Sequence, residues 1–305
     1  MERVRLMCWC RHCVSGLHLP AYAAAEGGLF AEQGLEVEFI DCVTVPERGL
    51  RGYGTTLKAL AGEQAEFALS SVAYLLAARS EAETELGARF AAVFHQRNPI
   101  AAMVAADSDL HQPEDLPGRR TASATGNWFV REYAGALAHM GFGAPDLVEP
   151  PEDVHAALRE GDIDVIPAWV DMLPGYSKQG PVRAVALDFE VYATGLVAGD
   201  RLPLELVLRM RDALAAGYEL QREQPELGIA AFRRHCPQRT EEHLRIGWSA
   251  IEPYVFDGRG PGSMDAERWR ATIDYTVAAH GLSASAPEQV YRPELLAPAL
   301  AHSAT

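Results

Sequence analysis

The chain has 305 residues, of which 48% are hydrophobic and 23% charged, the composition of a globular protein long enough for two compact lobes. Its formal net charge of −15 argues against a nucleic-acid surface, because such a surface carries a basic stripe that neutralises phosphates. No run approaches the ~20 apolar residues that a membrane span needs, and five cysteines, mostly clustered early, are a poor disulfide framework.

The N-terminal residues give no sign of export. Residues 1–5 lead straight into a short strand-like run, with no long apolar segment and no small-residue cleavage site after it. We therefore expect the chain as written to stay in the cytoplasm. A truncated start would instead place it in the periplasm or outside the cell.

The first hundred residues alternate short apolar runs with helical patterns. Residues 35–40, for example, alternate Val37 and Phe39 with glutamates, which predicts a strand with one face in water. Strands are predicted at 4–9, 35–40, 67–69, 90–94 and 100–105, and helices at 19–30 (with a stop at Gly27-Gly28), at 55–61, and from the 67–69 strand to residue 79.

The same alternation continues beyond a polar corner at residues 95–99. Strands are predicted at 120–122, 163–168, 182–186 and 191–197, and helices at 128–140, 154–160, 204–221, 226–235, 240–250 and 265–280. Strands that alternate with helices predict an α/β protein with mainly parallel sheets covered on both faces.

Four segments, in this order and spacing, resemble one known family. They are AYAAAEGGLFAEQGLEVEFID (21–41), LKALAGEQAEFALSSVAYLLAAR (57–79), PEDLPGRRTASATGN (113–127) and GSMDAERW (262–269). Together they resemble the NMT1/THI5-like family, whose members include sulfonate-, taurine- and pyrimidine-precursor-binding proteins. The resemblance covers most of the chain.

The resemblance implies a periplasmic-binding-protein type II fold, an α/β architecture of two lobes with a cleft between them. Residues 1–96 and 193–305 would form lobe one, and residues 97–192 would form lobe two. Ligand would contact strand ends and helix N-termini at the cleft, which is also where open α/β sheets bind ligands. The expected partner is a small-molecule ligand, and the importer branch of the family adds an ABC permease.

Hydroxyl-bearing residues stand at two expected helix starts, one in each lobe. Ser70 and Ser71 end the third strand, while Ser123, Thr125 and Asn127 precede the first helix of lobe two. Hydroxyls and unpaired backbone N–H groups at a helix start suit a carboxylate, sulfonate or phosphate. The structural alternative is an ordinary N-cap, a role that serine fills throughout proteins.

Further candidate ligand residues follow other predicted strands. Trp169 and Asp171 come directly after the strand at 163–168, and Tyr192 lies where the chain crosses back to lobe one. Tyr53 lies in the loop after the second strand and His12 in the loop after the first. An aromatic side chain at such a place packs on a flat ligand, or equally within the core.

Two functions of different classes remain open. The first is a binding protein that captures a small anionic or heteroaromatic molecule in the cleft. The second is a cytoplasmic enzyme, because Cys13 follows the first strand as a cysteine does in the similar aromatic sulfinate desulfinase branch. There Cys13 would be the nucleophile in C–S or acyl cleavage, and Arg51 with the Gly54 N–H would hold an anionic group. The early cysteines lack a second CxxC pair, so neither metal nor cofactor is expected.

Overall fold

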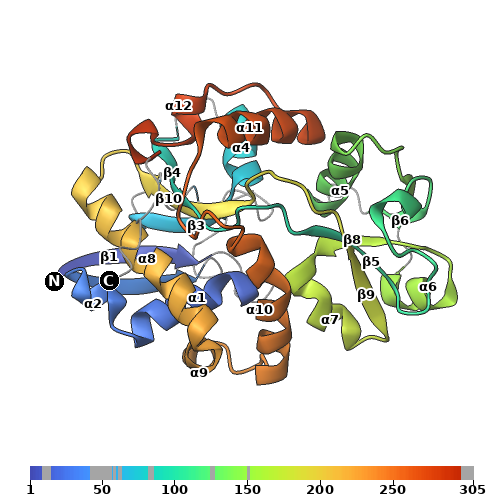
Figure 1. Cartoon of the computed structure of the whole chain (residues 1–305), viewed down its shortest axis with the longest axis horizontal. Helices are drawn as coiled ribbons and strands as arrows, with labels where there is room; N and C mark the ends of the chain where they lie inside the picture. Colours follow the sequence, from blue (N-terminus) through green and yellow to red (C-terminus); the bar gives the residue numbers. More distant parts are fainter. Residues whose placement is uncertain are drawn as a thin grey trace.

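The computed structural model describes residues 1–8, 15–41, 57, 60, 64–81, 86–123, 128–149 and 152–296. Its elements form two lobes, one around a five-stranded sheet and the other around a three-stranded and a two-stranded sheet, and two crossover segments connect them (Figure 1). Residues 94–99 lead from the first lobe to the second, and residues 187–193 lead back. The helix predicted at 55–61 lies almost wholly outside the described residues.

The first lobe contains a five-stranded sheet in the order β2-β1-β3-β10-β4. Its strands are β1 (Glu2–Cys8), β2 (Leu35–Asp41), β3 (Phe67–Ser71), β4 (Ala88–Val93) and β10 (Thr194–Gly199). Every residue of β3 and β10 is buried, because helices cover both faces of the sheet centre. This burial explains why these strands read as continuous apolar runs.

Helices from both ends of the chain surround this sheet. They are α1 (Ser15–Glu26), α2 (Leu29–Glu32), α4 (Val72–Glu81), α8 (Leu204–Glu223), α9 (Pro225–His235), α10 (Glu241–Val255), α11 (Ala266–His280) and α12 (Pro287–Val290), with a 3-10 turn at Pro293–Leu295. α1 packs against α8, α9 and α10. Within the described ranges, none of the helices is both long and apolar enough to span a bilayer.

The second lobe contains a three-stranded sheet, β8-β5-β9, and a two-stranded one, β6-β7. Its strands are β5 (Ile100–Ala105), β6 (Arg120–Ala122), β7 (Asp146–Val148), β8 (Ile166–Trp169) and β9 (Val182–Ala186). Its helices are α5 (Trp128–His139), α6 (Val154–Glu160) and α7 (Leu173–Ser177), with 3-10 turns η2 (Pro113–Asp115) and η3 (Val170–Met172).

Strand pairing is mixed rather than mainly parallel. β1 runs parallel to β2 and β3, and β6 parallel to β7, as expected. In contrast, β10 is antiparallel to β3 and β4, and β5 is antiparallel to β8 and β9. The reason is that β5 and β10 are entered through the crossovers, with no helix before them to return the chain to the opposite end of the sheet.

Capping residues fix where several helices begin and end. The Asp153 carboxylate accepts hydrogen bonds from two backbone N–H groups at the start of α6, and Asp265 accepts one from Arg268 N at the start of α11. Both helices end at a glycine in the left-handed conformation, Gly161 and Gly281. The predicted bounds of these two helices are therefore nearly correct.

The two lobes pack against each other on two sides. α10 packs on η3 and α7, and α11 packs on α5. The second contact is close, because a Cβ on Gly135 would lie 2.3 Å from the Cβ of Ala279. Beside it, the rings of Trp128 and His280 stack with centroids 3.7 Å apart. A hydrogen bond of 2.9 Å from the Tyr275 hydroxyl to the Glu132 carbonyl oxygen also joins these helices.

Candidate ligand-binding site

Three strands of the first lobe meet at the edge that faces the second lobe. β3 ends at Ser71 and β4 at Val93, whereas β10 begins there, with Thr194 opposite Ser71 and Gly195 opposite Val93. A Cβ on Gly195 would lie 2.0 Å from the Ala92 carbonyl oxygen, so only glycine permits this close approach. The outgoing crossover leaves from this edge and the returning crossover arrives at it, which places the residues of this edge between the lobes.

Several buried polar atoms at this edge have no hydrogen-bond partner among the described residues. They are Ser70 Oγ, Thr194 Oγ1 and both ring nitrogens of His95. The backbone of His95 is fixed, since its N–H donates to the Thr194 carbonyl and its carbonyl accepts from Ala193 N, each at 3.2 Å. An unpaired buried polar group costs about 1–3 kcal/mol. Such a group therefore indicates a place for a polar ligand or a water molecule.

The imidazole of His95 is neutral at physiological pH. Burial lowers its pKa to about 3, and the proximity of His18 adds to the effect. His18 is itself fully buried and lies in the first turn of α1. A neutral imidazole offers one N–H donor and one acceptor nitrogen, so His95 can pair with either kind of ligand atom.

Asp171 enters the same region from the second lobe. It lies in η3, directly after β8, and is 2% exposed. Neither carboxylate oxygen has a hydrogen-bond partner in the described part of the chain. Burial raises the pKa of Asp171 to about 7, and its own backbone N–H opposes this rise. Close backbone packing holds it in place, because a Cβ on Gly16 of α1 would lie 3.4 Å from the Asp171 Cβ.

Trp169 connects His95 to a second buried carboxyl. Its ring centroid lies 6.3 Å from that of His95, and its indole N–H donates to Glu132 Oε2 at 3.0 Å. Glu132 Oε1 accepts a 2.8 Å hydrogen bond from Asn98 Nδ2. Burial raises the pKa of Glu132 to about 7, although both hydrogen bonds oppose this rise. Glu132 thus differs from Asp171 in having both oxygens paired.

These observations define a junction cluster between the lobes. Its members are His18, Ser70, His95, Trp169, Asp171 and Thr194. All six side chains are buried, and four of them carry polar atoms that lack partners in the described structure. Ser70, Trp169 and Asp171 are sequence-predicted ligand residues, and all three lie at or next to the strand ends where the lobes meet. Ser70 stands opposite Gly195 and Thr194 opposite Ser71, so the side chains of Ser70 and Thr194 lie on opposite faces of the sheet.

Two further predicted residues have structural roles at a helix start and a strand end. Ser71 Oγ accepts a 3.2 Å hydrogen bond from Tyr74 N, which is the N-cap contact considered as the alternative for this residue. Ser123 follows β6 and is half-buried, and its N–H donates to the Val148 carbonyl at 2.8 Å. Their ligand roles stay predictions.

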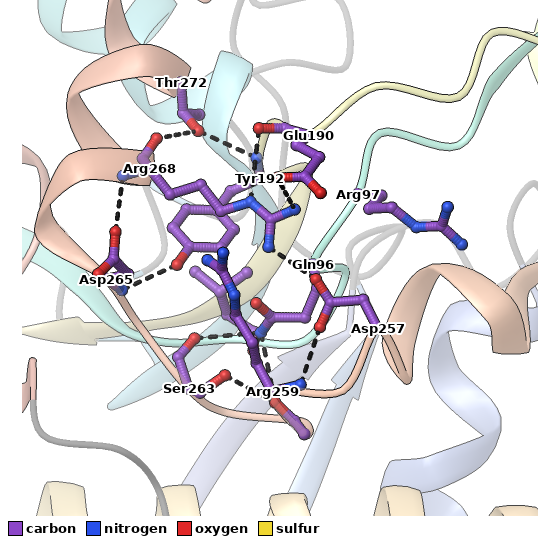
Figure 2. Close-up of polar contacts among 12 residues, drawn as sticks. Gln96, Arg97, Glu190, Tyr192, Asp257, Arg259, Ser263, Asp265, Arg268 and Thr272 are labelled. Carbon is purple, nitrogen blue, oxygen red and sulfur yellow. Dashed lines mark hydrogen bonds and ion pairs between the residues drawn. The ribbon is translucent and has the colours of Figure 1, made fainter.

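Tyr192 lies in a polar network that fixes the crossovers (Figure 2). Its hydroxyl accepts a 2.8 Å hydrogen bond from Asp265 N, and its N–H donates to Thr272 Oγ1. Arg268 lies over its ring, at 5.3 Å from the centroid, and forms an ion pair with Asp257 at 2.7 Å. These contacts tie the returning crossover to α11, and direct ligand contact by Tyr192 stays a prediction.

Gln96 joins the other crossover to the same network. Its side-chain amide donates to the carbonyl oxygens of Val93 at 2.9 Å and Ser263 at 3.1 Å (Figure 2). The Gln96 N–H also donates to the Tyr254 carbonyl at 2.7 Å. Both crossovers are therefore anchored to the first lobe, the outgoing one close to its start and the returning one close to its end.

The remaining sequence-predicted residues lie outside the described residues. They are His12, Cys13, Arg51, Tyr53, Gly54, Thr125 and Asn127. No group of three or more His, Cys, Asp and Glu side chains within the described ranges is arranged to hold a metal ion.

Thr194, His95, His18 and Glu132 were not among the predicted ligand residues, although the sequence carries a signal for them. Thr194, His18 and Glu132 are polar residues at positions where their elements are otherwise apolar, and His95 follows the apolar run of β4. Glu132, for example, stands four residues after Trp128 and four before Ala136, on the buried face of α5. A polar residue on such a face is unusual enough to mark a candidate site.

The fold is that of the periplasmic binding proteins. The periplasmic aliphatic sulphonate-binding protein SsuA from Escherichia coli has a TM-score of 0.72 and 14% identity, with 95% of this chain and 92% of that chain covered. The alkanesulfonate-binding protein SsuA from Xanthomonas axonopodis pv. citri, bound to MOPS, has a TM-score of 0.64 and 14% identity, with 95% and 98% covered.

An enzyme shares the same architecture. The desulfurization enzyme DszB, as a cysteine-to-serine variant in complex with biphenyl-2-sulfinic acid, has a TM-score of 0.60 and 16% identity, with 97% of this chain and 98% of that chain covered. At identities this low, the likeness concerns the fold alone.

The sequence also matches a family model. The model described as NMT1/THI5 like matches residues 16–227, which is more than half of the chain. The chain therefore belongs to the NMT1/THI5-like family, as the four sequence segments predicted. No curated protein sequence matches it.

Proposed function

We propose that this chain is a solute-binding protein that captures a small molecule between its lobes, with the junction cluster as the binding site. The observation that carries the proposal is the set of buried, unpaired polar atoms contributed by both lobes. Ser70, His95 and Thr194 come from the first lobe and Asp171 from the second. A ligand that contacts both sets would hold the lobes together, as a cleft-closing protein requires.

The hinge implied by this function would lie in the two crossovers. We assign residues 1–96 and 193–305 to lobe one and residues 97–192 to lobe two, so that each boundary falls within a crossover. Anchoring of Gln96 to the first lobe supports the boundary at residue 96. Tyr192, which this assignment places in lobe two, is itself hydrogen-bonded to α11 of the first lobe, so movement on the returning crossover would be confined to the residues before it.

Import is the process that this function would serve. The SsuA protein of Escherichia coli is named as a periplasmic binding protein, and by analogy we propose a periplasmic location and an ABC permease partner for this chain. The cytoplasmic location expected from residues 1–5 finds no support in that relative. Fractionation of the native host with an antibody to this chain distinguishes the two locations, since a cytosolic protein would contradict the import role.

A ligand screen followed by calorimetry tests the proposed binding site. Sulfonates, carboxylates and nitrogen heteroaromatics are screened for a rise in melting temperature, because a ligand that binds only the folded state stabilises it. The best compound is then titrated into wild type and into the Ser70→Ala/Thr194→Val double variant. Loss of two hydrogen bonds worth about 1 kcal/mol each lowers affinity about 30-fold.

Thr276→Val provides the matched control. Thr276 is a buried threonine whose hydroxyl donates within α11 to the Thr272 carbonyl at 2.7 Å. This variant should bind like wild type. Equal affinity in wild type and the double variant would place the ligand elsewhere.

Cys13→Ser distinguishes binding from the desulfinase-like alternative. A binding protein keeps nearly its full affinity in this variant, because sulfur and oxygen occupy similar space. Rapid, selective labelling of Cys13 by iodoacetamide near neutral pH, together with turnover that Cys13→Ser abolishes, would contradict the binding role and favour the enzyme.

A further inference from the structure

Glu132 lies where the second lobe, the outgoing crossover and a helix of the first lobe meet. It belongs to α5 and is 3% exposed. Its carboxylate accepts hydrogen bonds from Asn98 Nδ2 at 2.8 Å and from the Trp169 indole N–H at 3.0 Å. Its backbone carbonyl accepts a third, of 2.9 Å, from the hydroxyl of Tyr275 on α11. One residue is therefore bonded to the outgoing crossover, to the end of β8 and to the opposite lobe.

The two crossovers are joined to each other beside this residue. The Asn98 N–H of the outgoing crossover donates to the Phe189 carbonyl of the returning one at 3.5 Å. The Phe189 ring packs on Tyr275, with the ring centroids 5.0 Å apart. Because Asn98 is bonded to both Glu132 and Phe189, the position of the Glu132 carboxylate affects both connections between the lobes.

The partners of the Glu132 side chain require a carboxylate at this place. The indole nitrogen of Trp169 is only a donor. The Asn98 amide cannot reverse without loss, because its Oδ1 accepts a 3.0 Å hydrogen bond from Ile100 N. Both partners therefore present an N–H group to Glu132. A glutamine would accept from one of them and turn its own N–H groups toward the other.

We propose that Glu132 is a positioning residue of the interlobe hinge, whose carboxylate holds the outgoing crossover at Asn98 and the binding site at Trp169 in one fixed arrangement. This inference rests on the proposed function, because it names the residue that connects the hinge to that binding site. Trp169 is a member of the junction cluster, and its ring centroid lies 6.3 Å from that of His95. A ligand that moves Trp169 therefore acts on the crossover through a single carboxylate.

Hydrogen–deuterium exchange of the full chain without ligand tests the inference through the crossover amides. Burial raises the pKa of Glu132 to about 7, so its carboxylate is mostly ionised at pH 8, where exchange is measured. Glu132→Leu removes both acceptors and is similar in size. Loss of these charge-assisted hydrogen bonds should speed exchange about 10-fold or more in peptides covering residues 97–100 and 187–191. Glu132→Gln still accepts one of the two bonds and should restore part of the protection.

Glu66→Leu is the matched control. The Glu66 carboxylate accepts hydrogen bonds from the backbone N–H of Arg5 at 2.8 Å and from its guanidinium at 2.6 Å. Glu66 stands directly before β3, at the end of the sheet opposite to the crossovers. Its replacement should lower the stability of the first lobe and leave exchange at residues 97–100 and 187–191 as in wild type. A merely structural role of Glu132 would make the two leucine variants alike, with faster exchange spread along the chain.

The outcomes separate this inference from the proposed function. Circular dichroism and cooperative melting first show that each variant folds, and if Glu132→Leu does not fold, Glu132→Gln is compared with Glu66→Gln in the same way. Unchanged exchange in both crossovers, or faster exchange distributed evenly along the chain, would overturn the positioning role. Because no ligand is present, that result would leave the binding function standing. Absence of any stabiliser in the ligand screen would overturn the binding function and leave the exchange result unaffected.

Discussion

Replacing Asp171 by asparagine has a calculable effect on stability even without a ligand. Burial raises the pKa of this carboxyl from 3.8 to about 7 in the folded protein. Since these values differ by about three, and each pKa unit corresponds to about 1.4 kcal/mol, the ionised carboxylate destabilises the fold by about 4 kcal/mol above pH 7. The asparagine amide is also buried, so this figure is the largest gain that the variant can show.

The effect has a definite pH dependence. Below about pH 4 the carboxyl is protonated in both the folded and the unfolded chain, so the penalty is absent. Between about pH 4 and 7 the folded state binds more protons than the unfolded state, and the penalty grows as pH rises. We therefore expect wild type and Asp171→Asn to have similar free energies of unfolding near pH 4. The variant should be more stable by up to about 4 kcal/mol at pH 8.

Urea unfolding of both proteins over this pH range measures the difference directly. Glu132, whose pKa is also raised, is present in both proteins and cancels from the comparison. Asp164→Asn serves as a control, because its expected change in stability at neutral pH has the opposite sign. Burial raises the pKa of Asp164, but hydrogen bonds from Arg120 outweigh this and lower it overall. That variant should lose stability at neutral pH and match wild type in acid. A stability difference between wild type and Asp171→Asn that stays constant from pH 4 to pH 8 would refute the reasoning, since it would mean that the carboxyl ionises in the folded protein without a penalty.

Two other substitutions test the packing around the site. Gly135→Leu forces α5 away from α11, because even a Cβ at this position would lie 2.3 Å from Ala279 Cβ. Overpacking of this kind lowers the free energy of unfolding, measured in urea, by about 1–3 kcal/mol. Ala279→Gly should restore part of the loss, and no recovery would place the strain elsewhere. Ser71→Ala removes the hydrogen bond to Tyr74 N and should cost about 1 kcal/mol by the same assay. A change in ligand affinity much larger than the stability change would show that Ser71 also binds ligand.

Most of the fold could be predicted from local patterns. The buried strands read as apolar runs, and capping residues marked both ends of α6 and α11. Gly28, at φ 77°, begins α2 and separates it from α1, as the expected stop at Gly27-Gly28 indicated. The start of α1 at Ser15 was missed by four residues. The exposed strand β7 was also missed, because two of its three residues are exposed and show no apolar run.

The pairing direction of strands depended on tertiary structure. Whether β10 runs parallel or antiparallel to β3 depends on the route of the crossover before it, and residues 187–193 carry no periodic pattern that records this route. Prediction of the candidate ligand-binding site is also limited by its dependence on tertiary structure. Ser70 and Asp171 could be predicted because each lies at or just after the end of a strand. Glu132 could not be assigned to the site without knowing that α5 faces Trp169.

The stacked rings of Trp128 and His280 give the protein a built-in optical signal. Trp128 belongs to α5 of the second lobe and His280 to α11 of the first, and their rings lie 3.7 Å apart and nearly parallel. Burial lowers the pKa of His280 to about 3, so the imidazole stays uncharged and the stack does not change with pH in the neutral range. Separation of the lobes would expose the indole to water and shift its emission to longer wavelength. Lobe movement can therefore be followed in real time in the unlabelled protein, with Trp128→Phe identifying the share of the signal that comes from this ring.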